Sequence, residues 1–136
     1  MPHKVLFACV HNAGRSQMAA AFFRALADPA RAEAISAGTE PAPHIHPSVV
    51  TAMREVGIDL SHEKPRLLTE ELQQEIQHLV TMGCGERCPL VPAQEREDWA
   101  LPDPAGESLD RVRAIRDQIR GRVAHLVESR GWERRR

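Results

Sequence analysis

Apolar and polar residues alternate along the chain in blocks that predict strands and helices in turn. Three short apolar runs predict buried strands: 5–9, 32–37 and 78–82. Four segments repeat apolar residues every three or four positions and predict helices: 16–28, 50–56, 69–76 and 109–131. Residues 83–104 are rich in Gly and Pro, so we expect irregular structure with a short strand near 99–101. We expect 133–136 to be a frayed tail with Trp132 exposed beside it.

Strands that alternate with helices predict an α/β fold with a parallel sheet. In such sheets, ligands bind beyond the carboxyl ends of the strands. The three cysteines fit this rule, because Cys9 ends the first predicted strand while Cys84 and Cys88 follow the third. We find no internal repeat and no linker, so residues 1–136 are predicted to form a single domain.

Composition narrows the class of protein further. The 136 residues have a formal net charge of −1, which gives no reason to expect binding to nucleic acid or to a membrane. No apolar stretch is long enough for a membrane span, and the N-terminus does not resemble a signal peptide, so we expect a cytoplasmic protein. In that compartment three cysteines are more often catalytic, redox-active or metal-binding than structural disulfides.

The segment between the first strand and the first helix has the strongest chemical pattern. Its sequence is Cys9-Val10-His11-Asn12-Ala13-Gly14-Arg15-Ser16. A helix N-terminus offers unpaired N–H groups and partial positive charge, and small loop residues let backbone amides turn inward around an anion. The planar guanidinium of Arg15 suits two oxygens of a tetrahedral oxyanion. We therefore predict that this loop binds such an oxyanion.

The same positive field acts on Cys9 and favours a thiolate, because cysteines at helix N-termini ionise more readily than free cysteine. Ser16 is positioned to donate a hydrogen bond to that sulfur, and Asn12 to brace the loop. We assign His11 no catalytic role, because a thiolate held in a cationic loop needs no separate base. The alternative is a buried core cysteine with Arg15 on the surface, which leaves the Gly, Arg and Ser placement unexplained.

An oxyanion that loses an oxygen needs a proton donor, and Asp103 is the candidate. It lies in Leu101-Pro102-Asp103-Pro104, where two flanking prolines restrict the backbone and could orient the carboxyl group. Taken alone, such an aspartate is usually a turn residue; the Cys9 loop makes a catalytic role the better interpretation.

Together these motifs resemble the low-molecular-weight protein tyrosine phosphatase fold, and more closely the arsenate reductases on that scaffold that use thioredoxin or a small thiol. The matching stretches are 7–19, 36–38, 80–89, 97–99 and 101–106. The resemblance implies a parallel four-stranded sheet flanked by helices. Two features favour a reductase: the chain has no tyrosine, and Cys84 and Cys88 lie where the reductases keep their redox cysteines.

The resemblance also implies a mechanism. The Cys9 thiolate attacks arsenate held by Val10–Ser16 and Arg15, and Asp103 protonates the departing oxygen. Cys84 then attacks Cys9 and releases arsenite, and Cys88 resolves that bond into a Cys84–Cys88 disulfide. Thioredoxin, or mycothiol or glutathione with a redoxin, reduces this disulfide. Phosphate and sulfate are expected to bind as substrate analogues, and no bound cofactor or metal is expected.

Several features depart from that family pattern. Only three residues separate Cys84 from Cys88, Ala20 occupies a position where some members have a potassium-binding glutamate, and His11 stands where glycine is more common. Three other functions stay open: a phosphatase acting on a phosphorylated protein or small molecule, a non-enzymatic redox or oxyanion sensor, and a metal half-site made by Cys84 and Cys88 with nearby histidines.

Overall fold

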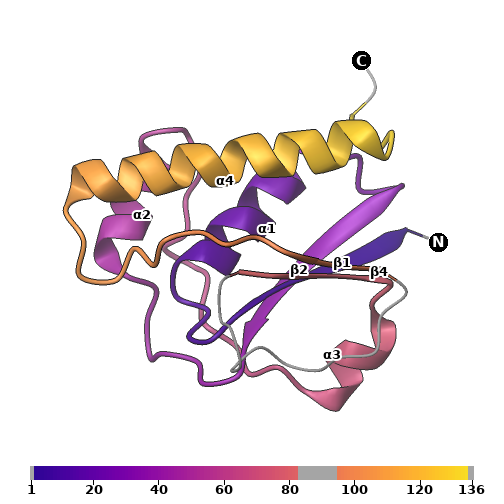
Figure 1. The fold of residues 1–136 in the computed structure, drawn as a ribbon, viewed down its shortest axis with the longest axis horizontal. Helices are drawn as coiled ribbons and strands as arrows, with labels where there is room; N and C mark the ends of the chain where they lie inside the picture. The colour runs from indigo at the N-terminus through magenta and orange to yellow at the C-terminus, as the bar shows by residue number, and fades with distance from the viewer. Residues whose placement is uncertain (1, 83–94, 135–136) are drawn as a thin grey trace.

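The computed structural model describes residues 2–82 and 95–134, and its strands form one parallel sheet in the order β2-β1-β3-β4. The strands are β1 (His3–Cys9), β2 (Ala32–Gly38), β3 (His78–Thr81) and β4 (Glu95–Asp98). The helices are α1 (Arg15–Leu26), α2 (Pro47–Arg54), α3 (Glu70–Glu75) and α4 (Leu109–Ser129). Helices α1, α2 and α4 lie on one side of the sheet and α3 on the other (Figure 1). The predicted parallel four-stranded sheet flanked by helices is confirmed.

The central strand β1 is apolar from Val5 to Cys9, because both of its faces are covered there. Val5 and Phe7 belong to the main core, which also contains buried side chains of α1 and α4. Leu6 and Ala8 point the other way, into a smaller cluster below the sheet that includes Leu79. A strand buried on both faces lacks the polar alternation of a half-exposed strand. Burial of each large side chain stabilises the fold by roughly 1.5–3 kcal/mol.

The helix ends follow local sequence. Thr69 caps α3, its hydroxyl accepting the Leu72 N–H, and Ser108 caps α4 in the same way through the Arg111 N–H. The predicted cap at Thr69 is therefore confirmed. By contrast, α1 begins after Gly14 without any side-chain cap. Within the part of the chain that the structure describes, no helix combines the length and apolar character needed to cross a bilayer.

The fourth strand lies earlier than predicted. We expected it near 99–101, whereas β4 spans Glu95–Asp98, and Trp99 follows it. All four β4 residues are charged, because β4 is an edge strand held to β3 by backbone hydrogen bonds rather than by an apolar face. Residues 95–98 therefore contain no apolar run from which a strand could be predicted.

The C-terminal tail is more ordered than predicted. Trp132 is partly buried against the main core, 5.9 Å between ring centres from Phe23 and 4.9 Å from His3. Glu133 forms a bridge with Ala27, and the Arg134 guanidinium donates to backbone carbonyls at the end of α1. The expectations of an exposed Trp132 and a frayed tail are thus wrong for residues 132–134.

Candidate active site

Cys9 ends β1 and is 4% exposed, with its sulfur facing two hydrogen-bond donors. The Ser16 Oγ lies 2.8 Å from Cys9 Sγ, and the Asn12 backbone N–H donates to the same sulfur at 3.2 Å. Although Cys9 borders the apolar core, its sulfur therefore has polar partners of its own. Two donors aimed at one sulfur stabilise negative charge on it.

The Asn12 side chain is oriented so that its amide nitrogen donates to Ser16. Its Oδ1 accepts the Arg66 N–H at 2.9 Å and the Gln17 Nε2 at 3.0 Å, so the oxygen end of the amide is fixed. Its Nδ2 then donates to Ser16 Oγ at 2.7 Å. Ser16 Oγ accepts from Asn12, and its own hydrogen can donate to Cys9 Sγ when that sulfur is a thiolate, which has no hydrogen to give. Asn12 adopts a φ of 51°, a left-handed conformation that asparagine tolerates better than most residues.

The loop backbone directs its carbonyl groups away from Cys9. The carbonyls of Val10, His11 and Ala13 accept backbone N–H groups from the segment 40–46 at 2.8, 2.9 and 3.0 Å. In a trans peptide the next N–H points opposite to the carbonyl. The N–H groups that follow these carbonyls therefore point away from 40–46, and that of Asn12 meets the Cys9 sulfur.

Two glycines let this loop lie close to its neighbours. A Cβ on Gly14 would lie 2.7 Å from Pro104 Cγ, so the turn after β4 presses directly against the start of α1. A Cβ on Gly38 would lie 2.6 Å from the Val10 carbonyl oxygen. No acidic side chain occupies the first turn of α1, so this turn carries no carboxylate of its own to offset the positive end of the helix.

Arg15 and Asp103 lie beside this loop. Arg15 Nη1 donates to the Leu101 carbonyl at 2.9 Å, and Nη2 lies 3.9 Å from Asp103 Oδ2. The Arg15 side chain is only 10% exposed, whereas that of Asp103 is 52% exposed. Asp103 Oδ1 also accepts the Ala105 N–H at 2.9 Å, which orients the carboxyl group. The carboxyl group is therefore oriented beside Arg15 while it stays open to solvent.

The structure therefore brings together the predicted residues Cys9, Arg15, Ser16 and Asp103. Cys84 and Cys88 lie outside the described residues. Among the neighbours of the loop, sequence reasoning missed Gln17, which is 2% exposed and donates to Asn12 and to the Lys64 carbonyl. The available signal was its position directly after Arg15 and Ser16, in the polar first turn of α1. The Leu101 carbonyl left no such signal.

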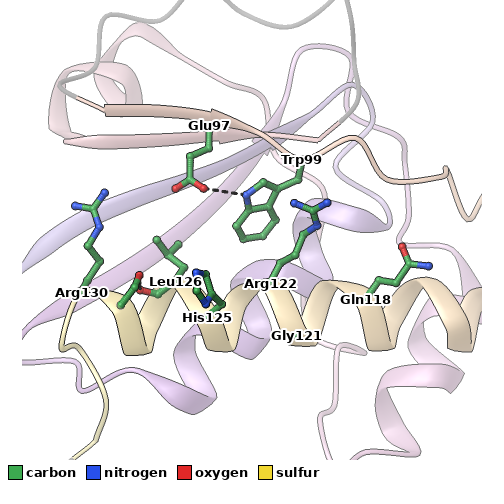
Figure 2. A pocket seen from close by; sticks show the side chains of 9 residues that line it. Glu97, Trp99, Gln118, Gly121, Arg122, His125, Leu126 and Arg130 are labelled. Carbon is green, nitrogen blue, oxygen red and sulfur yellow. Dashed lines mark hydrogen bonds between the residues drawn. The ribbon is translucent and has the colours of Figure 1, made fainter.

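A separate hollow of about 640 Å³ lies between β4 and α4 (Figure 2). Glu97, Trp99, Arg122 and His125 are among its lining residues, and none of Cys9–Ser16 is. Close by, the Arg130 guanidinium hydrogen-bonds to Glu95 and holds the pKa of that carboxyl at about 2. The cysteine loop therefore does not face this hollow.

The first strand of this α/β fold ends in a cysteine. A tight loop, an arginine and the N-terminus of a helix follow it. This arrangement is typical of proteins with a cysteine-containing anion-binding loop. The chain belongs to the low molecular weight phosphotyrosine protein phosphatase family, whose model matches residues 4–135.

The chain is also similar to several proteins named arsenate reductases. The glutaredoxin arsenate reductase of Synechocystis is 35% identical over 127 residues, covering 91% of this chain and 95% of that protein. The arsenate reductase of Shouchella clausii is 38% identical over 136 residues, covering 92% and 95%. The structure of the thioredoxin-dependent arsenate reductase of Corynebacterium glutamicum is 39% identical with a TM-score of 0.79, and matches 94% of this chain but 61% of that longer chain. The predicted resemblance to arsenate reductases is confirmed.

Proposed function

We propose that this protein is an arsenate reductase in which the Cys9 thiolate attacks arsenate bound by the loop. The observation that supports this most is the Cys9 sulfur, which faces Ser16 and the Asn12 N–H beside Arg15 at the uncapped start of α1. Tetrahedral oxyanions need such a set of donors, and a thiolate attack needs such a sulfur. The near full-length similarity to named arsenate reductases supports the choice of substrate.

In the first step, Cys9 Sγ forms a bond to arsenic(V) while one arsenic–oxygen bond breaks. Asp103, beside Arg15, supplies the proton that lets this oxygen leave as water. Loop amides and the guanidinium of Arg15 stabilise the remaining negative oxygens. The product of this step is a sulfur–arsenic(V) adduct on Cys9.

In the second step, the Cys84 thiolate attacks Cys9 Sγ and forms a disulfide. The sulfur–arsenic bond breaks, and its electron pair stays on arsenic, which leaves as arsenite. Cys88 then attacks Cys84, frees Cys9 and leaves a Cys84–Cys88 disulfide. The roles of Cys84 and Cys88 rest on the sequence resemblance and on their position after β3.

A dithiol donor must return two electrons to the Cys84–Cys88 disulfide. We propose thioredoxin, because a disulfide between two protein cysteines is the kind of substrate that thioredoxin reduces; the Corynebacterium glutamicum relative is itself thioredoxin-dependent. Glutathione or mycothiol with a redoxin is the second choice, and the name of the Synechocystis relative supports it. A relay that starts from three reduced thiols fits a reducing compartment such as the cytoplasm.

The relay is tested by trapping. Cys88→Ser protein treated with arsenate is expected to stop at a Cys9–Cys84 disulfide, detected by mass spectrometry of the non-reduced digest. Cys84→Ser protein is the matched control and should not form it. Absence of the Cys9–Cys84 disulfide from arsenate-treated Cys88→Ser protein would contradict the relay. The reductant is identified by arsenate-dependent NADPH oxidation with each reducing system supplied in turn.

A phosphatase is the second candidate, because the matching family is named for phosphotyrosine phosphatases. That activity needs Cys9, Arg15 and Asp103 but neither Cys84 nor Cys88. Protein with both Cys84→Ser and Cys88→Ser is expected to lose arsenate reduction while retaining any turnover of an aryl phosphate. Full catalytic turnover of arsenate by this double variant would contradict the proposed mechanism.

A further inference from the structure

The Arg15 guanidinium depends on the backbone that follows β4. Its Nη1 donates to the Leu101 carbonyl at 2.9 Å, and its Nη2 lies 3.9 Å from Asp103 Oδ2. The side chain is 10% exposed, so few waters surround it to replace a lost partner. Any shift of residues 99–103 therefore moves the partners of Arg15, although none of these residues is adjacent to it in sequence.

Trp99 fixes the start of this segment. Its backbone N–H donates to the Thr81 carbonyl at 2.8 Å, which extends the β3–β4 pairing by one residue. Its indole is buried and packs against Phe7 of β1, with ring centres 5.7 Å apart. Its Nε1 donates to Glu97 Oε1 at 3.1 Å (Figure 2).

The second oxygen of Glu97 binds His78. His78 Nε2 lies 2.7 Å from Glu97 Oε2, and His78 is fully buried at the first position of β3. An ionised carboxylate only accepts hydrogen bonds, so both the indole and the imidazole donate to it. The Glu97 carboxylate thus links Trp99 to the interior strand β3 through hydrogen bonds. The Glu97 side chain itself is 39% exposed.

We propose that Glu97 and Trp99 are positioning residues for the oxyanion site, acting on Arg15 through the Leu101 carbonyl. The inference rests on the proposed role of the Cys9 loop as an oxyanion site. In this arrangement the hydrogen bond of the indole N–H fixes the position of residues 99–101 directly after β4. The position of these residues in turn fixes the Leu101 carbonyl, which orients the Arg15 guanidinium. A bidentate arginine contact loses strength when its geometry shifts, since both N–H donors must stay aligned with the anion.

The test measures phosphate affinity by calorimetry and arsenate kinetics in four variants. Trp99→Phe keeps the ring but removes the N–H, and Glu97→Ala removes the acceptor. Glu97→Gln keeps an acceptor for the indole. Glu95→Ala is the control, because Glu95 lies two positions earlier on β4 and lies 3.9 Å from His78 Nδ1, but hydrogen-bonds to Arg130 rather than to Trp99.

We expect Trp99→Phe and Glu97→Ala to raise the phosphate Kd and the arsenate KM about ten-fold, the effect of losing one hydrogen bond to a charged group. Glu97→Gln and Glu95→Ala should stay within about two-fold of the parent protein, on the same scale. Folded Trp99→Phe protein with parental phosphate affinity would overturn the inference, as would an equal loss in Glu95→Ala.

The outcome also separates this inference from the proposed function. Weakened phosphate binding in Glu97→Ala, combined with no arsenate reduction by the parent protein, supports the positioning role and contradicts the reductase. Parental phosphate affinity in Glu97→Ala and Trp99→Phe, combined with normal arsenate reduction, contradicts only the positioning role. A parent protein that binds no phosphate overturns both.

Discussion

The sulfur of Cys9 and the hydroxyl of Ser16 lie 2.8 Å apart, joining the end of β1 to the start of α1. Asn12 donates to the same hydroxyl, and a thiolate at Cys9, which has no hydrogen to give, accepts the serine hydrogen. The uncapped N-terminus of α1 adds partial positive charge on the same side. These donors stabilise a neutral thiol only slightly, whereas each of them stabilises the negative charge of a thiolate. The contact between these two residues therefore links the fold to the proposed chemistry.

Removal of the Ser16 hydroxyl should slow the reaction of Cys9. Ser16→Ala deletes a hydrogen bond to a charged sulfur, and we expect alkylation of Cys9 by iodoacetamide at neutral pH to slow by about ten-fold or more. Ser129→Ala is the control, because that hydroxyl bonds the Leu126 carbonyl in α4, away from the loop. Equal alkylation rates in all three proteins would show that Ser16 does not stabilise the thiolate.

Asp103→Asn tests the proton donor. The amide preserves the acceptor for the Ala105 N–H but has no proton to give to a departing oxygen. We expect the single-turnover rate of arsenate-driven oxidation to fall by about 10²–10⁴, with phosphate affinity changed only slightly. The measurement is rapid-quench formation of the Cys9 adduct or its disulfide. An unchanged rate would assign the proton to another group, such as water.

Alanine substitutions at two glycines should change the stability of the protein in opposite directions. A Cβ on Gly38 would lie 2.6 Å from the Val10 carbonyl oxygen, so Gly38→Ala should destabilise the protein by about 1–3 kcal/mol. A Cβ on Gly121, within α4, meets nothing within 4 Å, so Gly121→Ala should stabilise it by about 0.4–1 kcal/mol. Urea unfolding of both variants measures these changes. Similar effects of the two substitutions would contradict the close packing of the loop against β2.

Acid should weaken the contact between α2 and α4. Hydrogen bonds from Arg113 and Arg116 to Glu55 lower the pKa of that carboxyl from 4.5 to about 2. Because the folded-state pKa lies below the unfolded one, the stabilisation is complete above pH 4.5 and is lost as pH falls toward 2. Glu55→Gln should therefore have a lower Tm than the parent at neutral pH, and the difference should shrink in acid. A Tm difference that does not depend on pH would contradict this.

Much of the fold could be predicted because its central strands and long helices have strong apolar periodicity. β1, β2, β3 and α4 were located from their buried residues. β4 could not be placed, since its four charged residues depend on partners such as His78 and Arg130 that no local pattern indicates. Trp132 was also misjudged, because its neighbours Phe23 and His3 are distant in sequence.

The part of the candidate site that lies in one continuous segment could be predicted from the sequence. The order Cys9, Gly14, Arg15, Ser16 was enough to predict a loop at a helix N-terminus, and the need for a proton donor singled out Asp103 between its two prolines. The supporting contacts were not predictable, because they come from backbone atoms of distant residues. The Arg66 N–H that orients Asn12 and the Leu101 carbonyl that orients Arg15 are two such contacts.

The central claim is that Cys9 is a reactive thiolate inside an oxyanion-binding loop. The most direct test is the rate at which iodoacetamide labels the Cys9 peptide at neutral pH, followed by mass spectrometry, with and without phosphate. We predict rapid labelling that phosphate slows in a saturable manner, and no such protection in Arg15→Ala protein. Slow labelling at neutral pH, or labelling that phosphate leaves unchanged, would contradict the claim.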